Sequence, residues 1–265
     1  MGFKLQDFIK LRPYVYHLTS RDNLRRLKRT GRMDSAAELI RMAERTDLLR
    51  KRRDKHEPLR IGDETVWLRD QLPLDEGSIL FEEGWDMPRL VEHINRRVFF
   101  WPGQAEGFSD YGLRHLGRYL EEGPTLLRIP LDKLVEANKG NSPRLCAYNS
   151  GSPRVVNKMK SPRGSKTFVT AEEFPKRRKD VIEVTFENFV LLPDETEVRF
   201  FTVTAWGPIP EEDAEADITP ARKFRMLLHI NPTRQRGKRT GSLARVSGWY
   251  MTFFAAGVIN EGVGR

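Results

Sequence analysis

The stretch Tyr-Val-Tyr-His-Leu-Thr-Ser-Arg-Asp-Asn-Leu-Arg-Arg-Leu-Lys-Arg-Thr-Gly, residues 14–31, decides the fold expected for this chain. Its first six residues are aromatic, β-branched or apolar around one histidine, which predicts a short buried strand over 14–19. Ser20 can cap a following amphipathic helix, and Gly31 can take the left-handed conformation that ends it. His17 would then lie at a junction between strand and helix, where a ligand can bind.

Two interpretations of His17 stay open at this point. A buried histidine is often a core residue whose ring nitrogens are bonded to backbone groups. However, a strand ending in His-Leu-Thr, then a polar cap, a short helix and a glycine, resembles the opening of the ADP-ribosyltransferase fold. The similarity is to DarT-type nucleic-acid ADP-ribosyltransferase toxins and a related uncharacterised bacterial family. The resemblance implies an α+β fold, with a split, mostly antiparallel sheet and helices around an NAD groove, in which His17 and Thr19 position the adenosine ribose.

Length and charge set the outer bounds. The 265 residues allow one sizeable core with an appendage, and 38% hydrophobic residues suit a folded protein. A net charge of +9 and a pI near 9.7 favour an anionic partner. Nucleic acid is the first candidate for that partner, although many basic proteins bind no polyanion.

The rare residue types restrict the chemistry. A single cysteine, Cys146, excludes an internal disulfide framework and a cysteine-rich zinc site, and it indicates a reducing compartment. The five histidines lack the paired spacing of metal ligands, so no metal is expected. The first ten residues do not resemble a signal peptide, and no window approaches the roughly 20 apolar residues of a membrane span. These observations predict a cytoplasmic protein that does not contact a membrane.

Residues 35–53 are predicted to form one long helix. Ser35 can cap it, Glu38 follows three residues later, and leucines and isoleucine approximate an apolar stripe. The helix would end in the basic cluster Arg50-Lys51-Arg52-Arg53. A solvated helix end, stabilised by the helix dipole, explains this cluster without a partner. The alternative is a phosphate-contacting patch beside the groove.

An aromatic strand is predicted over 97–101, where Arg-Val-Phe-Phe-Trp precedes Pro102 and Gly103, which are expected to end it. Such a strand is usually part of the core. The resemblance implies that Phe100 and Trp101 stack near the nicotinamide of NAD.

Other elements follow from helical or alternating patterns. The expected helices cover 86–95, Ser109 or Asp110 to Leu120, and 131–137, and the expected strands cover 64–68, 125–129, 144–148, 198–203 and 222–230. The rest of 58–84 is predicted to be rich in loops.

A polar turn, Asn149-Ser-Gly-Ser-Pro-Arg154, is followed by a basic loop that runs to residue 164. Exposed N–H groups and cations there can hold a pyrophosphate or a nucleic-acid backbone. Any solvated surface loop has a similar composition, so this alternative also stays open. The related uncharacterised family has an Asn-x-Gly-Ser turn followed by a Pro-Arg pair. The resemblance therefore implies a cofactor-binding role for Asn149 and Arg163.

Glu183 lies in a predicted strand between apolar residues, where a carboxylate is costly unless it is paired or faces a wet groove. It is either an ordinary outward-facing residue or a functional one, and Glu187 and Glu197 are competing carboxylates. DarT-type transferases place their catalytic glutamate on such a strand, followed by an apolar patch, a Pro turn and another strand. Residues 190–193 and Val198 repeat that order, so the resemblance implies that Glu183 is catalytic.

The chemistry requires these residue types together. Transfer of ADP-ribose breaks the nicotinamide–ribose bond through a cation-like sugar transition state, which a nearby carboxylate stabilises. Glu183 would bind the ribose hydroxyl and deprotonate the acceptor.

Two domains are expected: an ADP-ribosyltransferase-like domain over 1–206, and a C-terminal extension over 207–265 that contains the basic tract 232–244. The resemblance implies transfer of ADP-ribose from NAD to DNA or RNA, a role as a toxin or phage-defence effector, and an antitoxin protein as a partner. Two alternatives stay open. One is a catalytically silent, basic nucleic-acid-binding module of the same fold, and the other is an ADP-ribosyltransferase that acts on protein.

Overall fold

The computed structural model describes residues 2–108, 110–119, 122–200 and 206–210. The chain divides into two compact units, Met1–Ala216 and Asp217–Arg265, and the description below concerns the first. The strand expected over 222–230 and the basic tract lie outside the described residues. Within those residues the chain is α+β with a mostly antiparallel sheet, which confirms the predicted fold class at this level.

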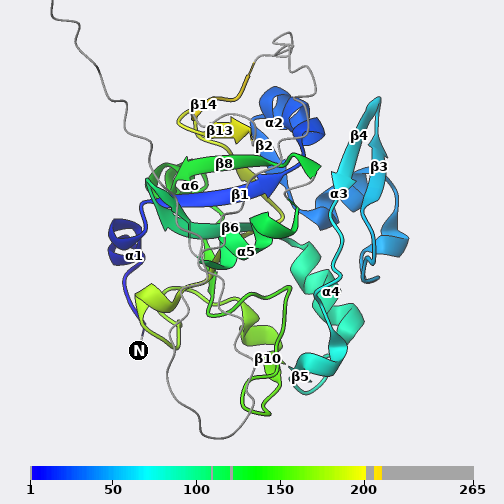
Figure 1. Ribbon diagram of the computed structural model, residues 1–265, viewed down its shortest axis with the longest axis vertical. Coiled ribbons are helices and arrows are strands. Elements are labelled where there is room, and N and C mark those ends of the chain that lie inside the picture. Colours follow the sequence, from blue (N-terminus) through cyan, green and yellow to red (C-terminus); the bar gives the residue numbers. More distant parts are fainter. Residues whose placement is uncertain (1, 109, 120–121, 201–205, 211–265) are drawn as a thin grey trace, which may run out of the picture. The chain divides into compact units, whose positions relative to one another are not determined.

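The centre of the unit is a sheet in the order β14-β13-β8-β1-β6-β11-β9, with β7 pairing to β6 (Figure 1). Each described pair in this sheet is antiparallel. The strands are β1 (Tyr14–Thr19), β6 (Arg97–Gln104), β7 (Gly107–Phe108), β8 (Thr125–Pro130), β9 (Arg144–Cys146), β11 (Glu183–Glu187), β13 (Glu197–Phe200) and β14 (Gly207–Pro208). Because β14 pairs with β13, the sheet continues beyond residue 206, where the first domain was expected to end.

The sheet splits along β6. The ladder between β1 and β6 runs from Tyr14 to Tyr16 and reaches Trp101 on β6. The ladder between β11 and β6 begins at Phe100 and continues toward the start of β6. The end of β1, from His17 onward, stays paired with β8 instead. The two neighbours of β6 therefore use different halves of it, and the sheet opens between the end of β1 and the first half of β6.

Smaller elements surround this sheet (Figure 1). Two-stranded sheets are formed by β2 (Arg32–Asp34) with β12 (Phe189–Leu191), by β3 (Glu57–Ile61) with β4 (Glu64–Leu68), and by β5 (Ile79–Phe81) with β10 (Ser161–Arg163). The α-helices are α1 (Leu5–Leu11), α2 (Leu24–Thr30), α3 (Ala36–Met42), α4 (Met87–Asn95), α5 (Asp110–Arg118) and α6 (Leu131–Ala137). None of the described helices has both the length and the hydrophobicity that a membrane span requires.

Local signals in the sequence set several of these boundaries. The Ser20 hydroxyl accepts a hydrogen bond from the N–H of Asp22, and Gly31 ends α2 at a φ of 58°. The Asp86 carboxylate caps α4 by accepting from the N–H of Arg89 at 2.8 Å. Strand 14–19 and helix 86–95 are therefore confirmed, and their caps explain why.

The long helix predicted over 35–53 is wrong beyond Met42, where α3 ends. Ser35 caps α3 as expected, but Glu44 takes a left-handed φ of 56°, which a continuing helix does not allow. A short 3-10 turn then brings Leu48 onto α3 and the β3–β4 hairpin. The later apolar residues of the stripe thus belong to a separate turn that packs on the same small core.

The predicted end of the aromatic strand at Pro102 is also wrong, because β6 continues to Gln104. Pro102 lies opposite Val15 of β1. On its other side β6 is paired with β11 only up to Phe100 and with β7 only from Gly103, so Pro102 lies in the gap between these two ladders. A proline is tolerated there because its missing N–H breaks no ladder bond.

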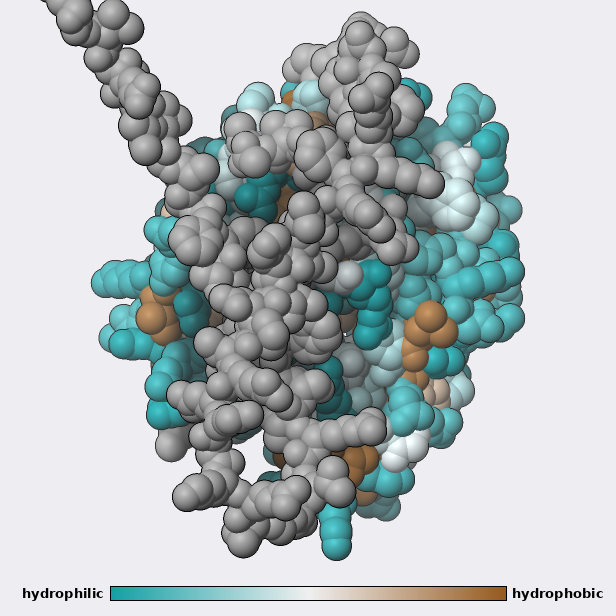
Figure 2. Space-filling model, viewed as in Figure 1, coloured by the Kyte–Doolittle hydropathy of each residue, from teal (hydrophilic) through white to brown (hydrophobic). Residues whose placement is uncertain are grey.

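The main core lies on one face of the sheet, where Val15, Phe100, Val184 and Phe186 are buried with helices α1, α2 and α6. Tyr16 and Leu18 alternate with these positions along β1 and pack on the opposite face. On the side of the molecule shown in Figure 2, the described surface is mainly hydrophilic, with separate hydrophobic side chains.

Candidate functional site

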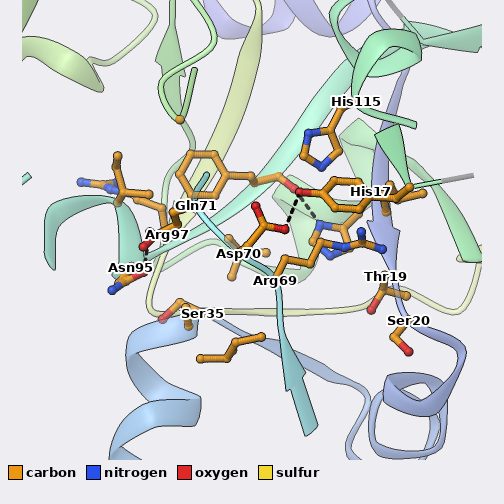
Figure 3. A pocket seen from close by; sticks show the side chains of 18 of the residues that line it. His17, Thr19, Ser20, Ser35, Arg69, Asp70, Gln71, Asn95, Arg97 and His115 are labelled. Atoms are coloured by element: carbon orange, nitrogen blue, oxygen red, sulfur yellow. Dashed lines mark hydrogen bonds between the residues drawn. The ribbon is translucent and has the colours of Figure 1, made fainter. Parts of the chain in front are cut away.

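A cavity of about 620 Å³ lies where the sheet splits, within the size range of small-molecule and cofactor sites (Figure 3). Its walls come from the end of β1, the first half of β6 and the start of β11, and from α3 and the end of β4. Five of the predicted site residues line it: His17, Thr19, Trp101, Asn149 and Glu183.

Glu183 is the first residue of β11 and is only 5% exposed. Its Oε1 accepts a hydrogen bond from the backbone N–H of Ser150 at 3.1 Å. Its Oε2 is buried and has no hydrogen-bond partner among the described residues. Burial raises the pKa of Glu183 to about 7, against the opposing effects of the Ser150 hydrogen bonds and the positive charge of Arg163. The carboxyl group therefore changes charge close to neutral pH, with one oxygen left for a ligand.

His17 has a fixed tautomer. Its Nδ1 lies 2.8 Å from the backbone carbonyl oxygen of Phe99, and because a carbonyl only accepts, we assign the proton to Nδ1. Burial lowers the pKa of His17 to about 4; the bond to Phe99 opposes this shift and the charge of Arg69 adds to it. His17 is thus neutral at pH 7, and its Nε2 is a hydrogen-bond acceptor.

Thr19 is fixed by the helix that follows it. Asn23 donates from Nδ2 to the Thr19 hydroxyl and to the carbonyl oxygen of Trp67, both at 3.3 Å. The side-chain oxygen of Asn23 accepts from the N–H of Trp67 at 3.2 Å. One asparagine therefore joins the end of β1 to β4 in the lining of the cavity.

The aromatic strand contributes different residues from those expected. Phe99 and Trp101 line the cavity, whereas Phe100 is fully buried in the main core. The Phe100 ring contacts Phe186 and the imidazole of His17, with ring centroids 6.0 and 5.7 Å apart. Residues from both faces of β6 line the cavity, so it is burial in the core that keeps the Phe100 ring out of it. Contrary to the expectation, Phe100 therefore does not line the cavity, and it packs against His17 from the core.

Arg163 also lies behind the cavity wall and not in it. Its side chain is nearly inaccessible, since the residue is 2% exposed. Its guanidinium donates to the carbonyl oxygens of Asn149 and Ser150 at 3.0 and 3.1 Å and to the Ser161 hydroxyl at 2.7 Å, and it lies over the Tyr148 ring. All three of its nitrogens are bonded to the chain, and, contrary to the expectation, Arg163 does not line the cavity. It is a positioning residue for the turn that brings Ser150 to Glu183.

The two competing carboxylates lie elsewhere. Glu187, at the other end of β11, is half-exposed and lies 3.3 Å from Arg96. Glu197 forms an ion pair with Arg128 at 2.6 Å. Neither lines the cavity. In the part of the chain that the structure describes, no three His, Cys, Asp or Glu side chains form a potential metal site.

Several cavity residues were not identified from the sequence. Phe99 and Ser150 were missed because a pattern does not show which strand residues line a cavity or which turn N–H bonds to Glu183. Three polar residues, Gln71, Asn95 and Arg97, form another wall (Figure 3). The predicted basic patch is divided: Arg50 is exposed, whereas Arg53 is buried and lines the cavity.

Comparison with known proteins gives one relationship. No protein of curated function and no solved structure matches this chain. A family described as "Family of unknown function (DUF7002)" matches residues 13–195, a stretch that contains all the residues lining the cavity. The chain therefore belongs to the DUF7002 family.

Proposed function

We propose that this protein is a mono-ADP-ribosyltransferase that transfers ADP-ribose from NAD to nucleic acid. One observation carries the proposal: His17 and Glu183, on the two strands that flank β6, line a single cavity at the point where the sheet splits. This is the arrangement that the resemblance to ADP-ribosyltransferases implies for the two residues. The proposal also rests on the free Oε2 of Glu183, a buried acceptor that needs a ligand.

Glu183 would carry out the chemistry. Loss of nicotinamide leaves positive charge on the ribose, and a carboxylate in a water-poor site stabilises that charge strongly. The Ser150 N–H holds Oε1, so Oε2 can accept from a ribose hydroxyl. The same carboxylate can then remove the proton from the attacking group of the acceptor.

The opposite wall suits the rest of NAD. The neutral imidazole of His17 offers Nε2 to a hydroxyl of the adenosine ribose, beside the Thr19 hydroxyl. The rings of Phe99 and Trp101 provide flat apolar surfaces for the nicotinamide. Asn149 adds a polar side chain next to Glu183's partner Ser150.

Charge favours nucleic acid as the acceptor. The net charge is +9, and Arg154, Lys158 and Lys160 are exposed in the loop that follows the cavity-lining turn 149–152. Cations beside an active site hold phosphates without regard to base sequence. Roles as a toxin or phage-defence effector, a cytoplasmic location and an antitoxin partner stay predictions.

The test is transfer of label from NAD that carries ³²P in its adenylate phosphate, with DNA, RNA and protein pools as separate acceptors. We expect label in nucleic acid with the natural chain and with Glu197→Gln, which changes a carboxylate outside the cavity. Glu183→Gln should transfer none. Label in protein alone would remove the nucleic-acid acceptor. No transfer, with nucleic-acid binding retained, would support a silent binding module.

A further inference from the structure

A second polar region of the cavity contains two arginines whose positive charges are not fully balanced by neighbouring carboxylates. Arg53, Asn95 and Arg97 meet here, together with Gln71. Figure 3 shows Gln71, Asn95 and Arg97 grouped on one side of the cavity, with His17 and Thr19 on the other. The two arginines flank Asn95: Arg53 bonds to its side chain, and Arg97 follows it by two residues at the start of β6.

Arg53 is a buried cation, 6% exposed, that lacks a counter-ion. Its Nε donates to the carbonyl oxygen of Arg69 at 2.9 Å, and its Nη1 donates to Oδ1 of Asn95 at 3.0 Å. No carboxylate described in the structure lies within ion-pair distance of the guanidinium, and Asp70 and Glu57 act on it only at longer range. Burial lowers the pKa of Arg53 to about 10, so it remains charged at neutral pH.

Arg97 is nearly as buried, with a side chain that is 9% exposed. The closest carboxylate oxygen belongs to Glu187, which is 4.0 Å from its Nη2, is itself half-exposed and lies closer to Arg96. The guanidinium lies over the ring of Phe168, and its Nε is buried without a described partner. Its positive charge is therefore only weakly compensated.

Burying a cation without a partner is unfavourable, and one reason to keep two of them at a cavity is that a ligand brings the negative charge. Arginine also presents a planar fork of donors that matches phosphate oxygens. We infer that Arg53 and Arg97, with Asn95 between them, form a phosphate-binding station for a phosphorylated ligand. The inference does not depend on the transfer reaction, because a protein that only binds nucleotides would use the same station.

The competing interpretation is structural, since Arg53 also joins the end of α4 to the segment after β4 through Asn95 and the backbone of Arg69. Titration calorimetry on the full chain separates the two. The probes are sodium pyrophosphate, ADP-ribose, adenosine and a short single-stranded DNA. The variants are Arg97→Gln, Arg53→Gln and Arg53→Lys, with Arg50→Gln as the matched control, because Arg50 is an exposed arginine of the same segment. Thermal melting of each variant comes first.

We expect Arg97→Gln and Arg53→Gln to weaken pyrophosphate and ADP-ribose binding at least about tenfold, with adenosine binding unchanged. Arg53→Lys should lose less, because it keeps the charge and loses the fork. Arg50→Gln should bind as the natural chain does. If only DNA binding depends on the two arginines, the station holds a nucleic-acid phosphate.

Two results would overturn the inference. One is that no phosphate-bearing probe binds the natural chain. The other is that Arg97→Gln and Arg53→Lys, both folded, bind every such probe as tightly as the natural chain does. Should Arg53→Gln fail to fold, these two variants still decide the question. Failure of the transfer reaction would leave phosphate binding measurable, so the two proposals fail separately.

Discussion

The backbone N–H of Ser150 donates to Oε1 of Glu183 at 3.1 Å and so joins the turn after β9 to the first residue of β11. Since Oε2 has no partner in the described part of the chain, the carboxyl group is held from one side and open on the other. The carboxyl group is thus held in position through one oxygen, and its second oxygen is available to accept a hydrogen bond.

The activity of Glu183 should depend on pH. Its raised pKa of about 7 means that the carboxylate needed for transfer forms only as pH rises through this value. We expect the transfer rate to increase from pH 6 to 8 and level off above. Glu183→Gln should remove this pH dependence and hold the rate at least about 100-fold below the plateau of the natural chain. Initial rates with labelled NAD measure both effects, and a flat pH profile would contradict the assignment.

The same group should destabilise the fold at high pH. Because the folded-state pKa of Glu183 is above its ordinary value of 4.5, the folded chain binds more protons than the unfolded chain between about pH 4.5 and 7. Stability from this group is therefore lost as pH rises through that window. Glu183→Gln should be more stable than the natural chain at pH 8, by up to about 3 kcal/mol, and nearly equal at pH 4.5. Urea unfolding at both pH values tests this, with Glu197→Gln as control.

His17 allows the two roles of an imidazole to be separated. Asparagine can place its amide nitrogen near the position of Nδ1 and keep the bond to the Phe99 carbonyl, but it has no group at Nε2. His17→Asn should therefore fold normally and raise KM for NAD about tenfold, with a smaller change in kcat. An unchanged KM in the folded variant would show that Nε2 does not bind NAD.

Buried neutral histidines should make the fold sensitive to acid. Burial is the main cause that lowers the pKa values of His17 and His93 to about 4 and that of His115 to about 3. The unfolded chain binds protons at these groups below pH 6.5 and the folded chain does not, so stability falls as pH drops toward 4. Glu183 has the opposite effect, because its raised pKa makes the fold more stable as pH falls, but it is one group against three histidines.

His93 offers a test of that acid sensitivity outside the cavity. His93→Gln removes one titrating group, so the fall in unfolding free energy between pH 6.5 and 4.5 should become smaller by about 2 kcal/mol. Urea titrations at the two pH values measure the difference. An identical fall in both proteins would mean that His93 is protonated in the folded chain.

Arg163 should contribute mainly to the stability of the fold, because it does not take part in the proposed chemistry directly. Arg163→Met would leave the buried carbonyl oxygens of Asn149 and Ser150 without their donors and cost at least about 3 kcal/mol of unfolding free energy. Lys160→Met, in the exposed part of the same loop, should change stability little. Chemical denaturation compares them. Near-natural stability of Arg163→Met would show that the turn is held by other contacts.

The elements that were predicted correctly are those whose sequence signals lie within a few residues of one another. Strand 14–19, helix 86–95 and helix 131–137 depend on alternation, a capping side chain or an apolar stripe within a few residues. The positions of His17 and Glu183 at the cavity agree with the expectation, because each lies at the end of such an element.

The failures have tertiary causes. Pro102 is expected to end a strand in isolation, but β6 continues through it, because Pro102 pairs with Val15 and lies between the β11 and β7 ladders on the other side. Phe99 and Phe100 differ only in which face they present, and the register with β1 and β11 decides that. The burial of Arg53 and Arg163 depends on partners that lie 42 and 14 residues away, Asn95 and Asn149. No short window of sequence contains those contacts.

The walls of the cavity are gathered from segments scattered between β1 and β11. During synthesis, a chain that has emerged only as far as β9 has His17 and the aromatic strand but not Glu183, the buried carboxylate at the start of β11. Long-range contacts of this kind form late, because much of the chain must first be ordered. The cavity described above is therefore complete only after β11 has been made and has paired with β6.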